Sequence, residues 1–140
     1  MKNLFVISMA LFLFVLNHSG KAQTQEQYEH YNYLVLTKQI QQLQPIILTA
    51  EALATEDGPG FGDFQVVICG QTVNELTDKP MMKKFTDKAE QSNIQLVICG
   101  FSLEKFEVDR DELPEGLEIV ENGILYSFQL QKKGYLSIEL

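Results

Sequence analysis

Histidine and cysteine are scarce in this sequence. It has two histidines and two cysteines among 140 residues. Of the two histidines, only His30 lies beyond residue 22. A Ser-His-Asp or Cys-His catalytic arrangement is therefore hard to assemble, and so is a zinc site built on histidine. The cysteines do not form a C-x-x-C pair, which excludes a thioredoxin-type motif, and they are too few for a disulfide-built scaffold. We predict neither a metal nor a cofactor.

Basic residues are also fewer than acidic residues. The chain has 11 Lys and Arg against 19 Asp and Glu, a formal net charge of −8, and no cluster of basic residues. Such a surface repels the phosphates of nucleic acids and the headgroups of anionic lipids. We therefore expect no nucleic-acid partner and no membrane-surface partner.

A complete phosphate-binding loop is missing as well. The segment "GPGFG" at 58–62 precedes an apolar run, whereas a dinucleotide-binding loop follows a strand and opens a helix. No Gly-Lys-Ser/Thr completes a P-loop, so we interpret residues 57–63 as a linker. The acidic stretch 107–115 lacks the spacing of a calcium loop, and we interpret it as a solvated charged loop.

The amino terminus has the pattern of a secretory signal peptide. Lys2 precedes a mostly apolar run over residues 4–16, and Gly20 and Ala22 stand at small-residue positions suited to cleavage. The run is shorter than the about twenty residues that a membrane-spanning helix needs. We predict a signal peptide over residues 1–22, export to the periplasm or the extracellular space, and no membrane attachment after cleavage.

The remaining chain predicts one α/β domain. Residues 23–30 are polar and are predicted to be a flexible leader, and residues 31–140 are long enough for one compact domain. "FQVVIC" and "IQLVIC" are continuous apolar runs, typical of strands covered on both faces. Alternating strands and helices predict a parallel sheet with helices on both faces. The expected strands are 31–38, 64–69, 94–99, 117–122 and 136–140, and the expected helices are 44–56, 78–93 and 123–135.

Two of these strands end in the same dipeptide, Cys69-Gly70 and Cys99-Gly100. Their spacing fits one right-handed βαβ unit, which places both cysteines at the carboxyl edge of the sheet, where ligands and chemistry collect. Neighbouring strands lie about 4.8 Å apart, a separation that a disulfide tolerates. Backbone N–H groups of the following turns would instead favour a reactive thiolate. The residues alone leave three interpretations open: buried hydrophobic thiols, a disulfide, or a nucleophilic cysteine.

The carboxyl-terminal half resembles the DsrE/DsrF-like proteins of sulfur metabolism. The likeness rests on "IQLVICGFSLEKFEV" at 94–108 and "DELPEGLEIVENGILYSFQLQKKGYLSIEL" at 111–140. The shared order is a strand ending in Cys, a Ser/Thr-Leu segment, a Leu-Pro loop, a Val-x-x-Gly strand end, and a helix with Gln and Lys-Gly-Tyr before the last strand. "DFQVVICG" at 63–70 and "YNYLVLTK" at 31–38 are similar to the two earlier strands of that family.

The resemblance implies a three-layer α/β/α sandwich with a mainly parallel five-stranded sheet, often assembled into homo-oligomers. It also implies that Cys99 accepts sulfur as a persulfide from a donor protein or passes it to an acceptor protein. We therefore expect an exported sulfur carrier or thiol-redox protein with Cys99 as nucleophile. The alternative is a non-catalytic oligomeric or partner-binding module with both cysteines buried or bridged. In the first case Cys69 is the accessory or disulfide partner, and the turn residues lining the site are Gly70, Gly100 and Ser102.

Overall fold

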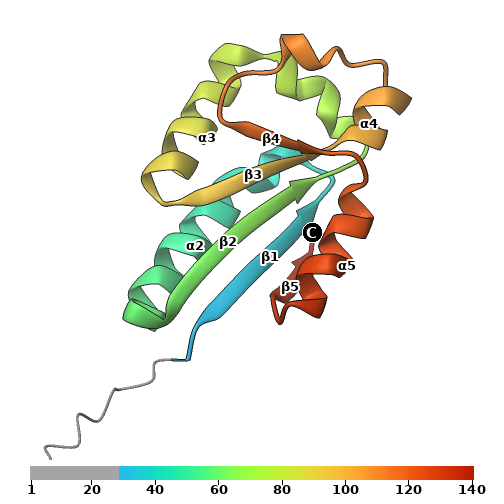
Figure 1. The fold of residues 1–140 in the computed structure, drawn as a ribbon. Coiled ribbons are helices and arrows are strands. Elements are labelled where there is room, and N and C mark those ends of the chain that lie inside the picture. Colours follow the sequence, from blue (N-terminus) through green and yellow to red (C-terminus); the bar gives the residue numbers. More distant parts are fainter. Residues whose placement is uncertain (1–28) are drawn as a thin grey trace, which may run out of the picture.

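The computed structural model describes residues 29–140. The predicted signal peptide over 1–22 and most of the predicted leader lie outside the described residues. The described chain forms one five-stranded sheet with the strand order β4-β3-β2-β1-β5, in which every neighbouring pair is parallel (Figure 1). The strands are β1 (Tyr31–Thr37), β2 (Phe61–Ile68), β3 (Ile94–Cys99), β4 (Leu117–Val120) and β5 (Leu136–Glu139).

Helices cover both faces of the sheet and complete a three-layer α/β/α sandwich. One face carries α2 (Leu43–Asp57) and α3 (Lys79–Gln91), and the opposite face carries α5 (Gly123–Lys132) (Figure 1). The short helix α4 (Gly100–Lys105) follows β3 directly. The predicted parallel α/β architecture is confirmed. Within residues 29–140 no helix combines the length and the apolar character that a membrane crossing requires.

Local sequence signals explain where α3 and α5 begin. The Asp78 side chain accepts a hydrogen bond from the Met81 N–H, and Pro80 occupies the first turn of α3, where its missing N–H costs nothing. Asn122 caps α5 in the same way by accepting from the Leu125 N–H at 3.0 Å. These caps fix the first residues of both helices, and for α5 they also fix the position of Gly123 at the carboxyl edge of the sheet.

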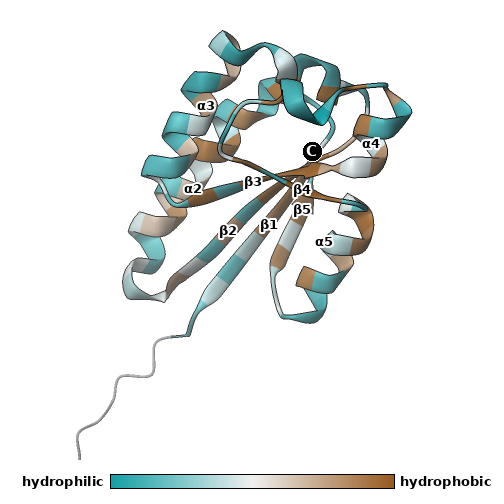
Figure 2. Cartoon of the chain, turned by 45° about the horizontal axis from the view of Figure 1, so that its top comes forward, coloured by the Kyte–Doolittle hydropathy of each residue, from teal (hydrophilic) through white to brown (hydrophobic). Residues whose placement is uncertain are grey.

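The sheet separates two hydrophobic clusters of unequal size. Alternate strand residues point to opposite faces, so the larger cluster lies between the sheet and α2 and α3, and the smaller one lies under α5. Figure 2 shows hydrophobic residues (brown) along β3 and on α5. The smaller cluster consists of Leu34, Val67, Cys69, Val97, Cys99 and Leu130. Both cysteines therefore face α5.

The predicted linker over 57–63 is partly wrong, because β2 begins at Phe61. Phe61 pairs with Tyr31 and Phe64 pairs with Tyr33, so β2 carries one extra residue in a bulge. The Asn32 side chain accepts a hydrogen bond from the Asp63 N–H at 2.8 Å and stabilises this bulge. A contact between residues this far apart in the sequence leaves no local signal, and the Gly-Pro composition of the segment obscures the strand.

Candidate thiol site

Cys69 and Cys99 lie side by side at the carboxyl edge of the sheet. The register of β2 and β3 pairs Ile68 with Ile98, which brings the residue after each of them, Cys69 and Cys99, to the same height. Both thiols are free, and their residues are 6% and 4% exposed, respectively. The structure thus brings the two sequence-predicted cysteines together on one face of the sheet and covers both of them.

Gly123, the first residue of α5, lies directly over this thiol pair. Its N–H donates a hydrogen bond to the Cys99 Sγ at 3.3 Å. A Cβ atom at this position would lie 2.8 Å from the Cys69 Sγ and 3.0 Å from the Cys99 Cβ. Only a glycine lets the helix N-terminus approach both cysteines so closely, and that N-terminus favours negative charge on the neighbouring sulfur.

The three predicted turn residues have different roles. The Ser102 Oγ accepts a hydrogen bond from the Gly70 N–H at 2.8 Å, which leaves its own hydroxyl proton for the Cys99 sulfur. Gly100 instead faces the end of β4, where an added Cβ would lie 3.1 Å from the Cα of Glu121. Ser102 and Gly70 therefore belong to the thiol site, whereas Gly100 allows the chain to pack closely against the segment after β4.

The two thiols have opposite ionisation tendencies. Burial, together with the adjacent Cys99 sulfur, raises the pKa of Cys69 to about 12. Burial also acts to raise the pKa of Cys99, but hydrogen bonds from the Ser102 hydroxyl, from the backbone N–H groups of Gly123 and Ser102, and from the Cys69 thiol outweigh it. The pKa of Cys99 is therefore lowered from the ordinary value of 9.0. Cys99 is the better thiolate, and Cys69 is its neutral hydrogen-bond donor.

Removing the Ser102 hydroxyl is expected to raise the pKa of Cys99. In a Cys69→Ser background only one thiol remains, so thiolate ultraviolet absorbance against pH reports on Cys99 alone. Ser102→Ala should move the titration midpoint upward, because the thiolate loses a hydrogen-bond donor. Ser127→Ala is the matched control, since that buried hydroxyl donates to the Gly123 carbonyl at 2.7 Å and to no sulfur. Equal midpoints in the two variants would contradict the assignment of Ser102.

A small groove opens beside Cys69. It has a volume of about 360 Å³ and lies between α5, β1 and β5. Its apolar lining includes Leu34, Leu36, Ile124 and Phe128, and Lys38 and Glu139 form an ion pair at 2.5 Å among the residues that line it. Cys69 contributes to this lining, whereas Cys99 does not. The groove therefore gives small molecules a route to the Cys69 side of the pair.

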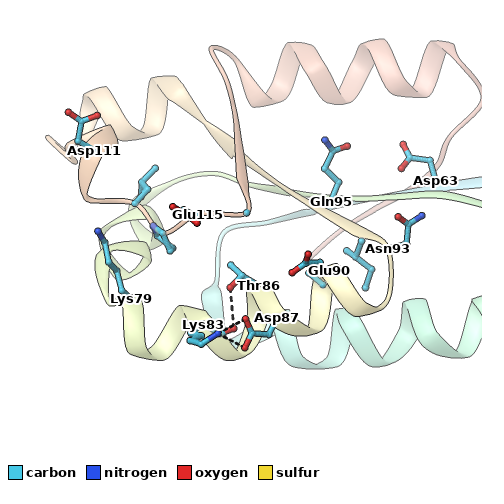
Figure 3. Close-up of a pocket in the computed structure, with 15 residues that line it drawn as sticks. Asp63, Lys79, Lys83, Thr86, Asp87, Glu90, Asn93, Gln95, Asp111 and Glu115 are labelled. Atoms are coloured by element: carbon cyan, nitrogen blue, oxygen red, sulfur yellow. Dashed lines mark hydrogen bonds and ion pairs between the residues drawn. The ribbon is translucent and has the colours of Figure 1, made fainter.

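A larger groove of about 1070 Å³ lies elsewhere, between α3 and the loop that precedes β4 (Figure 3). Its lining mixes polar and apolar side chains, and its charges partly neutralise one another, as in the Lys83–Asp87 ion pair at 2.8 Å. Within residues 29–140 no group of three or more His, Cys, Asp or Glu side chains is placed to hold a metal ion. Neither cysteine lies in this groove, and we assign no chemistry to it.

Sequence reasoning missed Gly123 as a site residue. Its contact with the cysteines joins the start of α5 to β2 and β3, and no local pattern reveals such a pairing. One signal was nevertheless present: in "ENGIL" a glycine follows the helix cap Asn122 and occupies the first helical position. Glycine has no Cβ and is the residue used where another group approaches the backbone closely, so its presence there points to such an approach.

Comparisons with known proteins identify structures with a similar fold, and those proteins are of unknown function. No family model and no curated protein matches this sequence. The structure is similar to MTH1491 of Methanobacterium thermoautotrophicum, a protein of unknown function, with a TM-score of 0.68 and 19% identity over 79% of this chain and 99% of that chain. It is also similar to BT1422 of Bacteroides thetaiotaomicron, likewise of unknown function, with a TM-score of 0.56 and 17% identity over 78% and 95% of the two chains. These matches establish a shared α/β fold.

Proposed function

We propose that the protein is an exported sulfur carrier or thiol-redox protein of the DsrE/DsrF-like kind, with Cys99 as its nucleophile. One observation carries this proposal. The Cys99 Sγ accepts a hydrogen bond from the Gly123 N–H at the start of α5, and the Cys69 thiol lies beside it. A thiolate stabilised by a helix N-terminus is the form that attacks sulfur. The sequence resemblance supports the same residue, since it implies a sulfur-accepting cysteine at position 99.

The sulfur-accepting step balances without an added oxidant. The Cys99 thiolate attacks the outer sulfur of a donor persulfide R–S–SH. A new bond forms between the Cys99 Sγ and that sulfur, and the donor S–S bond breaks. The donor leaves as the thiolate R–S⁻, and Cys99 becomes Cys99–S–SH. Gly123, Ser102 and Cys69 provide the hydrogen bonds that stabilise the attacking thiolate before the reaction.

The burial of Cys99 restricts the donor. Its residue is 4% exposed, and the first turn of α5 lies over it. Small inorganic persulfides and polysulfides fit this geometry better than a folded donor. A donor or acceptor protein, as the sequence resemblance implies, would require the first turn of α5 to move.

Inorganic polysulfide offered to reduced Cys69→Ser protein is expected to add about 32 Da per sulfur, because Cys99 holds the persulfide and nothing displaces it. Cys99→Ser, which keeps Cys69, is the matched variant and should gain no mass, because burial keeps Cys69 protonated. Intact-protein mass spectrometry separates the two results. Equal labelling of both variants would exclude Cys99 as the nucleophile.

A second candidate function is a partner-binding module that forms homo-oligomers. It is favoured by three large apolar residues on α5, Ile124, Leu125 and Phe128, which are 58%, 54% and 57% exposed. Exposed apolar clusters of this kind are typical of protein contacts. If α5 mediates self-association, Phe128→Glu should reduce the mass measured by light scattering to that of one chain. An unchanged mass would argue against this surface, and Lys132→Glu on the same helix controls for added charge.

A further inference from the structure

Cys69 has no role in the sulfur-accepting step beyond donating a hydrogen bond, yet its position suits a second reaction. Cys69 and Cys99 follow paired residues of neighbouring parallel strands, and such strands lie about 4.8 Å apart. A disulfide requires Cα atoms about 4.4–6.8 Å apart, so the strands do not have to separate or close for a bond to form. Both side chains belong to the same small cluster under α5, and a Cβ placed on Gly123 would contact both residues. The Cys69 thiol also donates a hydrogen bond to the Cys99 sulfur, so the two sulfurs are in contact.

We propose that Cys69 is the resolving thiol that discharges the Cys99 persulfide as hydrogen sulfide. This inference rests on the proposed function, since it requires a persulfide on Cys99. The outer sulfur of the persulfide anion Cys99–S–S⁻ first takes the proton of the adjacent Cys69 thiol, which converts Cys69 to the attacking thiolate. The Cys69 thiolate then attacks the Cys99 Sγ, a Cys69–Cys99 bond forms, and the bond from Cys99 to the outer sulfur breaks. The outer sulfur leaves as HS⁻ with the proton that Cys69 lost. Over both steps the sulfane sulfur gains two electrons and the two thiols become a disulfide, which an external dithiol then reduces.

The geometry favours internal discharge over transfer to a second protein. Cys99 is covered by Gly123 and does not line the groove, so a large acceptor has no direct path to its outer sulfur. Cys69 is already in place and lines the groove of about 360 Å³. The product is a small molecule that can leave through this groove, and a small dithiol can enter the same way. The protein would thus convert sulfane sulfur to sulfide at the expense of a dithiol.

The test uses the full chain reduced with dithiothreitol, freed of reductant, and treated with a limiting amount of inorganic polysulfide. Intact mass is measured together with released hydrosulfide, which is trapped by a bimane reagent. Wild type should lose about 2 Da and release one hydrosulfide per chain above the level of the variants, because the bridge replaces the persulfide. Cys69→Ser and Cys69→Ala should keep the added mass of about 32 Da and release only the hydrosulfide that the polysulfide itself gives up when its terminal sulfur is transferred. Circular dichroism confirms that the variants are folded.

The outcomes separate this inference from the proposed function. If wild type keeps about 32 Da of added mass as stably as Cys69→Ser, the resolving role is wrong and the sulfur-accepting role of Cys99 stands. If no variant that retains Cys99 gains or loses mass, the sulfur-accepting role is wrong, and the resolving role fails with it. Adding dithiothreitol to bridged wild type should restore the starting mass, which distinguishes a disulfide from irreversible oxidation.

Discussion

Gly123→Ala should destabilise the protein by about 2 kcal/mol, although alanine is the better helix former. The added Cβ would lie 2.8 Å from the Cys69 Sγ and 3.0 Å from both the Cys99 Cβ and the Val67 Cγ1. These atoms belong to the buried cluster under α5, so α5 or the strands have to shift. The gain in helix propensity is at most about 1 kcal/mol and does not offset overpacking of about 1–3 kcal/mol. Denaturant unfolding measures the difference.

The same substitution, Gly123→Ala, should also make the Cys99 thiolate less stable relative to its protonated thiol. Displacing α5 lengthens the hydrogen bond from the Gly123 N–H to Cys99, now 3.3 Å, and the pKa of Cys99 should rise. Cys69→Ala combined with Gly123→Ala is the control, because it removes the sulfur that makes the shortest contact. The double variant should be less destabilised than the sum of the two single variants. If the destabilisation of the double variant equals the sum of the two single variants, the contact between the added Cβ and the Cys69 sulfur does not determine how much Gly123→Ala destabilises the protein.

Phe64→Ala should cost about 3–5 kcal/mol, a large part of the total stability of about 5–15 kcal/mol expected for a domain of this size. Phe64 lies on β2, the central strand of the sheet, and is 1% exposed in the larger cluster. Its ring lies 5.8 Å from that of Tyr33 and 6.4 Å from that of Phe61. Truncation leaves a cavity beneath α2 that the parallel strands cannot close.

Phe101→Ala is the matched control for this loss. Phe101 is 55% exposed at the start of α4, and the same truncation there should change the free energy of unfolding by about 0.5 kcal/mol or less. Chemical denaturation of both variants at one pH gives the comparison. A Phe64→Ala protein within about 1 kcal/mol of wild type would mean that β2 is not a central strand of the core.

Much of the fold could be predicted because the strands of a buried parallel sheet are continuous apolar runs. "FQVVIC" and "IQLVIC" marked β2 and β3 and placed both cysteines at one edge. The start of β2 was missed because its bulge depends on Asn32, a residue of the neighbouring strand. The helix α4 was missed because it has only six residues and follows Cys99 without a connecting turn.

The site was predictable only in part. Local reasoning found Cys69 and Cys99, and it named Ser102, whose hydroxyl contacts the site. It could not show that α5 delivers the N–H of Gly123 to the same sulfur, because that contact depends on how a distant helix packs. It also assigned Gly100 to the thiols, whereas this glycine faces Glu121. Positions of side chains relative to other elements are tertiary information that composition and spacing do not contain.

The uneven division of the core has a consequence for how the sulfurs are reached. Among the described helices, only α5 contributes side chains to the cluster that holds both cysteines. Its one buried apolar member of that cluster is Leu130, which is 2% exposed. Local detachment of this single helix would uncover both sulfurs while the larger cluster stays folded. Thiol labelling rates would then follow a fluctuation at the carboxyl-terminal end of the chain, and they would be largely insensitive to changes that alter only global unfolding.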